Sequence, residues 1–209
     1  MLAERTRGVG TDLMFYHIKS QQVEEVLQLL NREEVSINQQ DINGETALHV
    51  ATGLGYSNIV RLLLSQGADP DIASYTDVGH MTPLLKASEQ GRLNIAEMLV
   101  KAGADLDVRN RNGQTALILA IRNSHSAIAK FLVSAGADLE QRDLAGCNAG
   151  FYAKQLELTE LVDLLPAPVT MKGEELVNFH NFVRQVIGSK PKEKKGKGKK
   201  KGKKGKKKK

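Results

Sequence analysis

The stretch Gly103-Ala104-Asp105-Leu106-Asp107 decides the fold, because the chain contains it three times with small changes. The other two copies are residues 67–71 and 136–140, so the starts lie 36 and 33 residues apart. A second motif begins with a threonine and repeats with the same two spacings, at Thr46, Thr82 and Thr115. Two motifs that repeat in one register indicate a tandem array, in which each unit needs its neighbours to bury its apolar face.

The order of residues in the second unit resembles the ankyrin repeat. The motif Asp41-x-x-Gly44-x-Thr46-Ala47-Leu48-His49 is followed by Ala51, Gly55, a hydrophobic stretch and Gly67-Ala68-Asp69. The resemblance covers about residues 9–168 and implies an all-α solenoid of about five helix-turn-helix units joined by finger-like β-turns. The register predicts an array over 1–168, with units at about 8–40, 41–76, 77–109, 110–142 and 143–168, the outer two degenerate.

Single residues of the second unit have structural roles that follow from their type. Thr46 is expected to cap a helix that runs to about Gly53, because a threonine hydroxyl accepts a hydrogen bond from an early helical amide. Gly55 and Gly67 supply left-handed positions that end the two helices without a Cβ penalty. For His49, the resemblance implies a structural histidine that hydrogen-bonds near the helix start, rather than a metal ligand or a catalytic group.

Four departures from the repeat pattern are visible. The 36-residue spacing predicts an insertion of Ser74-Tyr75-Thr76 in one finger, and His80 stands where a turn glycine is usual, next to Gly79. Ser124 occupies a helix-ending glycine position, which predicts local strain. Gly150 stands where leucine packs in other units, which predicts that the fifth unit is the least stable.

The resemblance implies that the fingers and the exposed side of each first helix contact protein partners. Carried over by position, this face contains Asn43, Glu45, Leu54, Tyr75, Met81, Glu89, Gln90, Arg111, Asn112, Gln114, Arg122, Asn123, Leu144 and Gln155. Tyr75 is a candidate hot spot because tyrosine offers a large rigid area with a polar end; a tolerated surface insertion is the alternative. Two interpretations fit the four arginines at positions 109, 111, 122 and 142. Either Arg109, Arg111, Arg122 and Arg142 form a cluster that clamps carboxylates or phosphates of a partner, or they are a scatter of solvated charges.

The segment after the array has its own pattern. Pro166-Ala167-Pro168 ends the last repeat helix, since proline cannot continue it. In residues 169–188, an apolar stripe predicts an amphipathic helix from about Gly173 to Ile187, formed by Leu176, Phe179, Val183 and Val186. Such a helix either caps the end of the array or docks in a groove of another protein.

The last 21 residues, 189–209, contain fourteen lysines and one acid, for a net charge of +13. The whole chain carries +6, so residues 1–188 carry a net charge of −7. A segment of lysine and glycine cannot form a core, so we expect a disordered tail. It is a solubilising tether, a nuclear address, a nonspecific RNA or DNA binder, or a contact for anionic lipid. The lysines expected to meet an import receptor or nucleic acid are Lys194, Lys195, Lys199, Lys200, Lys201, Lys203 and Lys204. Because the tail has no arginine, aromatic or amide side chain, we expect no base-specific recognition.

Several classes of protein do not fit the sequence. Cys147 is the single cysteine, so an internal disulfide is excluded and a reducing compartment, the nucleus and/or the cytoplasm, is expected. The start of the chain lacks a signal-peptide core, and no run of about 18 apolar residues occurs. No phosphate-binding loop, zinc spacing or nucleophile elbow is present, so we expect no enzyme, cofactor or metal site.

These observations predict a non-catalytic adaptor or inhibitor that is a monomer when alone. Its array would hold a protein partner, for example a kinase, a cell-cycle factor or a transcription factor, and its tail would bring the complex to the nucleus or near nucleic acid. The alternative is an RNA- or chromatin-associated factor whose polylysine tail is the main, sequence-nonspecific binding device.

Overall fold

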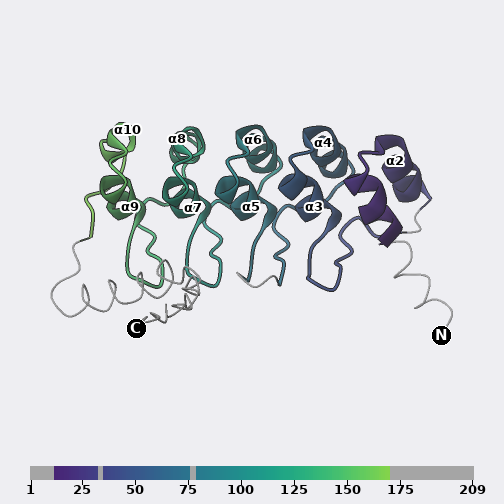
Figure 1. The fold of residues 1–209 in the computed structure, drawn as a ribbon, viewed down its shortest axis with the longest axis horizontal. Coiled ribbons are helices and arrows are strands. Elements are labelled where there is room, and N and C mark those ends of the chain that lie inside the picture. Colours follow the sequence, from purple (N-terminus) through teal and green to yellow (C-terminus); the bar gives the residue numbers. More distant parts are fainter. Residues whose placement is uncertain (1–11, 33–34, 76–78, 170–209) are drawn as a thin grey trace, which may run out of the picture. The chain divides into compact units, whose positions relative to one another are not determined.

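The computed structural model describes residues 12–32, 35–75 and 79–169, and the helix expected over residues 173–187 and the lysine tail lie outside these ranges. Within them, five helix pairs stack side by side (Figure 1). The first pair is a helical segment at residues 12–19 with α2 (Val23–Asn31). The others are α3 (Ala47–Leu54) with α4 (Ser57–Ser65), α5 (Pro83–Glu89) with α6 (Leu93–Lys101), α7 (Ala116–Arg122) with α8 (Ser126–Ser134), and α9 (Ala149–Gln155) with α10 (Thr159–Val162).

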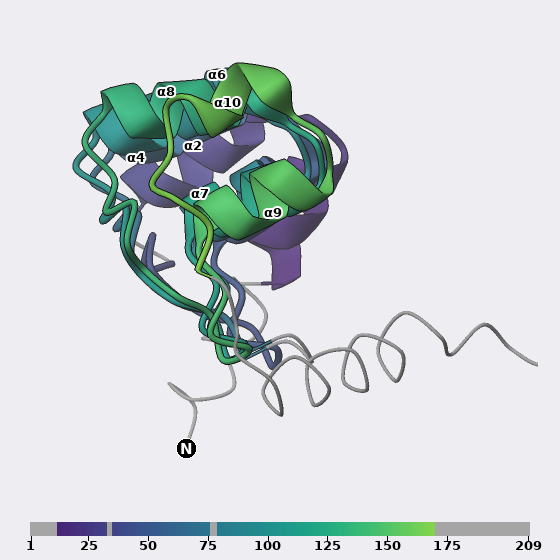
Figure 2. The same cartoon turned by 90° about the vertical axis from the view of Figure 1, so that its left-hand side faces the viewer.

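The helices form two layers, with α4, α6, α8 and α10 in one row and α3, α5, α7 and α9 in the other (Figures 1 and 2). Fingers extend from the second row, and the described residues contain isolated β-bridges, Ser74 to Met81 and Arg142 to Asn148, but no regular strand. The prediction of an all-α solenoid is therefore confirmed.

Each first helix of units two to five begins at a side-chain cap. Thr46, Thr82 and Thr115 accept a hydrogen bond from the backbone N–H three residues on at 3.4 Å, and Asn148 does so at 3.0 Å. Such caps satisfy amides that have no partner inside the helix. Each of these first helices is also followed by a residue with positive φ. After α7 this residue is Ser124, with a φ of +60°, which confirms the strain expected at this position.

The core between the two rows repeats with the sequence. Ala51, Ala87, Ala120 and Ala153 occupy equivalent positions and are all fully buried, so the neighbouring first helices can approach closely. Leu63, Leu99 and Leu132 are also equivalent and fully buried, in the row formed by α4, α6 and α8. One unit alone would expose these side chains, because adjacent units provide the surface that covers them.

The repeated acidic motif joins neighbouring units. The carboxylate Oδ1 of Asp71 accepts the backbone N–H of Asp105 at 2.9 Å, and that of Asp107 accepts the N–H of Asp138 at 2.9 Å. Asn38 does the same for the N–H of Asp69 at 2.9 Å. The second acid of one copy therefore accepts the backbone N–H of the first acid of the next copy, which explains why both positions recur.

The C-terminal end of the described array closes in a different way. A Cβ placed on Gly150 would lie 2.1 Å from the carbonyl oxygen of Pro166, and the side-chain amide of Asn148 donates to the carbonyl of Ala167 at 3.3 Å. The chain after α10 therefore returns across the start of α9. Gly150 replaces the usual leucine because this returning backbone occupies the leucine's space.

Candidate protein-binding surface

The four described fingers share one closing hydrogen bond, which sets their register. The amides of Asp41, Ser74, Asn110 and Asp143 donate to the carbonyls of Glu45, Met81, Gln114 and Cys147 at 2.9 to 3.0 Å. Ser74 is therefore equivalent to Asp41, and the three additional residues of the finger that Ser74 and Met81 close are 76–78, which lie outside the described residues. The prediction that Ser74-Tyr75-Thr76 forms the insertion is wrong, because hydrogen bonding places Ser74 and Tyr75 in the regular finger.

The residue after each of these donors lies at the tip of its finger. We call Ile42, Tyr75, Arg111 and Leu144 the fingertip row. The three apolar members are exposed, with 98% of the Ile42 surface, 61% of Tyr75 and 75% of Leu144 accessible to solvent. Sequence reasoning missed Ile42, although its equivalence to Arg111 and Leu144 was a signal that could have found it.

Backbone bonds between fingers hold this row in place. The tip amides of Tyr75, Arg111 and Leu144 donate to carbonyls of the preceding finger, those of Asn43 at 2.7 Å, Gly79 at 3.2 Å and Asn112 at 2.9 Å. The ring of Tyr75 lies against Gly44, where an added Cβ would be only 2.3 Å from a ring carbon. Tyr75 is thus presented in one orientation, which lowers the entropy lost when a partner binds.

Two polar side chains also join adjacent fingers. The side-chain amide of Gln40 donates to Gly44 O in its own finger at 2.8 Å and to Ala73 O in the next at 3.1 Å. The guanidinium of Arg109 repeats this arrangement with Gly113 O at 3.1 Å and Arg142 O at 2.6 Å. Arg109 is therefore a structural link, and the four arginines do not form one clamp.

The first helices carry a second set of contacts on the same side. Lys86 of α5 forms an ion pair with Glu45, and it crosses Gly53, where an added Cβ would lie 2.8 Å from the lysine Cε. The Arg122 guanidinium lies 5.3 Å from the centre of the Tyr152 ring, in cation–π range. Two of the predicted contact groups, Glu45 and Arg122, are thus already held by neighbours.

Tyr152, which contacts Arg122, belongs to a buried polar cluster with Asp143 and Cys147. The hydroxyl of Tyr152 donates to Asp143 Oδ2 at 2.5 Å, and burial together with this bond raises the pKa of Tyr152. Burial and the charge of Asp143 raise the pKa of the nearby Cys147 thiol to about 11. The thiolate that reacts with oxidants or metals is therefore scarce at neutral pH.

The hydrogen bonds of His49 confirm the prediction that it is a structural histidine. Its Nδ1 accepts the N–H of Thr46 at 3.1 Å, and its Nε2 donates to Met81 O in the next finger at 2.8 Å. Burial lowers the pKa of this imidazole, so the neutral form is favoured. The described residues contain no group of three His, Cys, Asp or Glu side chains that could hold a metal ion.

Most of the predicted contact residues are exposed. The structure places on the surface Asn43, Leu54, Tyr75, Gln90, Arg111, Asn112, Arg122, Asn123, Leu144 and Gln155, with Glu45 and Glu89 half-buried. Met81 is 5% exposed and Gln114 is 4% exposed, which corrects their assignment to this face. Both close a finger beside a helix cap, and the Gln114 Oε1 accepts from the Asn110 side chain at 3.1 Å.

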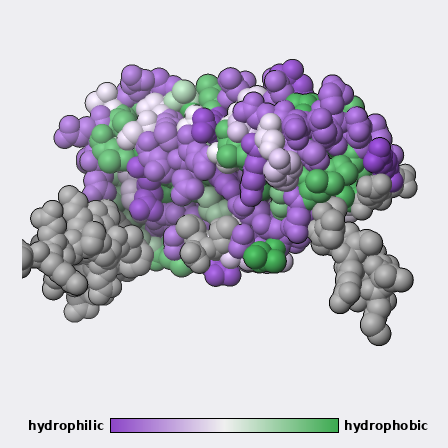
Figure 3. All heavy atoms as spheres, turned by 45° about the vertical axis from the view of Figure 1, so that its right-hand side comes forward, coloured by the Kyte–Doolittle hydropathy of each residue, from purple (hydrophilic) through white to green (hydrophobic). Residues whose placement is uncertain are grey.

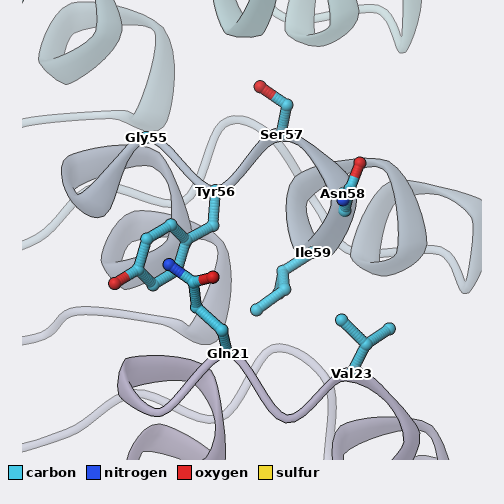
Figure 4. Close-up of a pocket in the computed structure, with 7 residues that line it drawn as sticks. All are labelled: Gln21, Val23, Gly55, Tyr56, Ser57, Asn58 and Ile59. Atoms are coloured by element: carbon cyan, nitrogen blue, oxygen red, sulfur yellow. The ribbon is translucent and has the colours of Figure 1, made fainter.

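A pocket of about 340 Å³ lies away from the fingers, between the turns of the first two helix pairs (Figure 4). It is lined by Gln21, Val23, Gly55, Tyr56, Ser57, Asn58 and Ile59. In Figure 4 the Gln21 side chain lies beside the Tyr56 ring. At the next two junctions the guanidinium of Arg92 covers Gly55 and the ring of His125 covers Gly91. The pocket lining contains no carboxylate, imidazole, amine or thiol.

The hydropathy of the surface agrees with separate exposed apolar residues at the fingertips. Figure 3 shows hydrophobic side chains in small separate groups among hydrophilic ones, including groups at the lower edge where the fingers end. Within the described ranges, no helix combines the length and the apolar character that crossing a lipid bilayer requires.

Comparison with known proteins agrees with the repeated architecture. The family model described as ankyrin repeats, in three copies, matches residues 3–74 and 72–143. A search of the curated proteins found no match. The family match covers more than half of the chain, and the chain therefore belongs to the ankyrin-repeat family.

Proposed function

We propose that the chain is a non-catalytic adaptor or inhibitor that holds one protein partner with its fingertip row and with the exposed side of its first helices. Ankyrin repeats are protein–protein interaction modules and are typically non-catalytic. The observation that carries the proposal is the fingertip row, where Ile42, Tyr75 and Leu144 are exposed at equivalent positions. Exposed apolar side chains on a fixed framework mark interaction sites, and aromatic anchors contribute much of the binding energy.

The partner surface continues from the fingertips onto the helices. Leu54, Gln90, Asn123 and Gln155 are exposed at or just after the ends of the first helices. Arg122 adds a cation whose position is set by Tyr152. A kinase, a cell-cycle factor or a transcription factor is the class of partner we propose, bound without turnover.

The tail is assigned a separate task. We propose that the lysines of residues 189–209 direct the complex to the nucleus or near nucleic acid, with the protein in the nucleus and/or the cytoplasm. Support comes from the net charge of +13, which attracts phosphate without selecting a base.

A capture experiment tests the array and the tail separately. The full chain, the variant Ile42→Ser/Tyr75→Ser/Leu144→Ser, and a variant with glutamine at the seven tail lysines 194, 195, 199, 200, 201, 203 and 204 would be used as baits, each with and without nuclease. Mass spectrometry then identifies the captured proteins. A bait with Arg61→Ser on α4 serves as the surface control, because Arg61 is exposed but lies outside the proposed face.

The proposal expects one protein that survives nuclease, is kept by the lysine variant and the Arg61 control, and is lost from the fingertip variant. If capture instead disappears with nuclease or with the lysine variant, the polylysine tail is the main binding device. The chain is then an RNA- or chromatin-associated factor, and the adaptor proposal is wrong.

A further inference from the structure

Neighbouring fingers bond through a repeated two-part pattern. The tip amide of one finger donates to a backbone carbonyl of the finger before it, as Leu144 does to Asn112 O at 2.9 Å. In two fingers, the side chain before the turn donates to a carbonyl of the finger after it, from Gln40 to Ala73 O and from Arg109 to Arg142 O. Each finger in this array is therefore hydrogen-bonded to the finger beside it through backbone carbonyls.

The finger that leads into the fifth unit, residues 136–148, is the last in the described array. Its Arg142 is equivalent to Gln40 and Arg109, and its Ala145 is equivalent to Asn112. Among the described residues, no acceptor lies within hydrogen-bond distance of the exposed Arg142 guanidinium. Within the same part of the chain, the carbonyl of Ala145 accepts from the Cys147 thiol alone, a weak donor at 3.7 Å.

We propose that this open edge binds an extended, acidic peptide segment of a partner protein. A backbone N–H of the peptide donates to Ala145 O, a peptide carbonyl or carboxylate accepts from Arg142, and an apolar side chain packs on Leu144. The proposal rests on the proposed function and names the kind of segment that the array takes. This mode of binding is β-strand addition to the edge of a finger, in which main-chain hydrogen bonds supply affinity and side-chain contacts supply selectivity.

Internal repetition supports a peptide backbone as the ligand of this edge. The guanidinium of Arg109 holds a carbonyl of the adjacent finger at 2.6 Å, so the same residue type in the same position suits a carbonyl oxygen. Leu144 is 75% exposed beside it, so an apolar side chain of the peptide would cover surface that water now contacts.

Charge supports an acidic peptide. Asp143, the acid next to Arg142 in sequence, is 93% buried and already accepts from Tyr152, and Arg111 adds a second exposed cation in the preceding finger. Guanidinium groups bind carboxylates through charge-assisted, often bidentate bonds. A segment that alternates acidic and large apolar residues matches the edge because alternate side chains of a strand point to opposite faces.

The test is a titration of the full, ¹⁵N-labelled chain with the peptide acetyl-Glu-Leu-Glu-Val-Glu-Leu-amide, followed by amide chemical shifts. We expect saturable shifts at residues 142–146 and a Kd that rises about tenfold in Arg142→Gln, as for loss of a charged hydrogen bond. Arg61→Gln makes the same charge change on α4 and should leave this Kd unchanged. Because both variants keep the lysine tail, attraction of the peptide to the tail affects them equally.

Three results would overturn the inference. Shifts confined to the tail amides, or equal Kd values for Arg142→Gln and Arg61→Gln, would show that the edge does not take the peptide. A dimer in sedimentation velocity that disappears in Arg142→Gln would assign the edge to a second copy of the chain. If the capture experiment recovers a nuclease-resistant partner that Arg142→Gln binds as well as the wild type, this inference fails while the adaptor function stands.

Discussion

At the scale of single residues, His49 shows how one side chain ties two units together. It accepts from the amide of the cap residue Thr46 and donates to Met81 O. Its loss leaves the buried Thr46 amide without its partner, while Met81 O keeps its hydrogen bonds from Ser74. Leu85 and Ile118 stand at the same position of the next two units and are also buried.

We predict that His49→Leu lowers the free energy of unfolding by about 1–3 kcal/mol, the usual cost of unsatisfied buried groups. Urea unfolding followed by circular dichroism measures this change. His80→Gln is the control because His80 is exposed, and a loss of equal size in that variant would contradict the role of the His49 bonds.

The same residue predicts a pH dependence. The pKa of folded His49 is lowered below 6.5, so the unfolded chain takes up the proton first as the pH falls. Its contribution to stability is present above pH 6.5 and is lost as the pH falls toward the folded pKa, by up to about 1.4 kcal/mol per pH unit. Urea midpoints between pH 7.5 and pH 5 should therefore fall less in His49→Leu than in the wild type.

Ser124 is the other residue whose environment allows a sharp prediction. Its φ of +60° is a conformation that costs an L-residue about 1 kcal/mol and glycine nothing. Ser124→Gly should raise the thermal midpoint, with a gain of about 0.5–1 kcal/mol after the added freedom of the unfolded chain. Ala127→Gly, at an exposed helical position of α8, should change stability in the opposite direction by about 1 kcal/mol, and equal signs would refute the argument.

At the scale of elements, helix α9 differs from the other first helices at Gly150. A repeat-based design would place leucine there, since Leu48, Leu84 and Leu117 are the equivalent residues. The carbonyl of Pro166 occupies that space, so the correct residue depends on the segment that follows α10.

We predict that Gly150→Leu destabilises the protein by about 1–3 kcal/mol, the typical cost of overpacking. The returning segment at residues 163–169 should also become more sensitive to limited proteolysis. Gln155→Leu adds the same side chain to an exposed position of α9 and should have little effect. A more stable Gly150→Leu variant would show that leucine fits here as in the other units.

At the scale of the whole molecule, a stacked array has stability that depends on the neighbours of each unit. The unit of α5 and α6 has neighbours on both sides, whereas that of α9 and α10 has one repeat neighbour and a last helix of only four residues. The prediction that the fifth unit is the least stable can be tested directly.

We predict that backbone amides of Thr159–Val162 exchange with deuterium faster than those of Leu93–Lys101 under native conditions, because the end unit opens without the rest. Leu99→Ala in the central unit should cost about 2–5 kcal/mol and accelerate exchange in the units on both sides. Uniform exchange across all units would instead mean that the array opens as a single cooperative body.

Local chemistry explains how much of this molecule could be read from its sequence. The two motifs in one register determined the helix pairs, the threonine caps and the array, because capping, helical periodicity and left-handed turns depend on residues close in the chain. They also located most of the exposed finger residues, since equivalent positions in a repeat have equivalent surroundings.

Only the tertiary structure decided features that depend on contacts between units. Hydrogen bonds between fingers placed Tyr75 in the regular tip row and moved the insertion to residues 76–78. Burial removed Met81 and Gln114 from the surface, and the returning backbone explained Gly150. The contrast between Arg109 and Arg142 is likewise a property of the stack: within the described residues Arg109 bonds to the finger after it, whereas Arg142 lies in the last described finger.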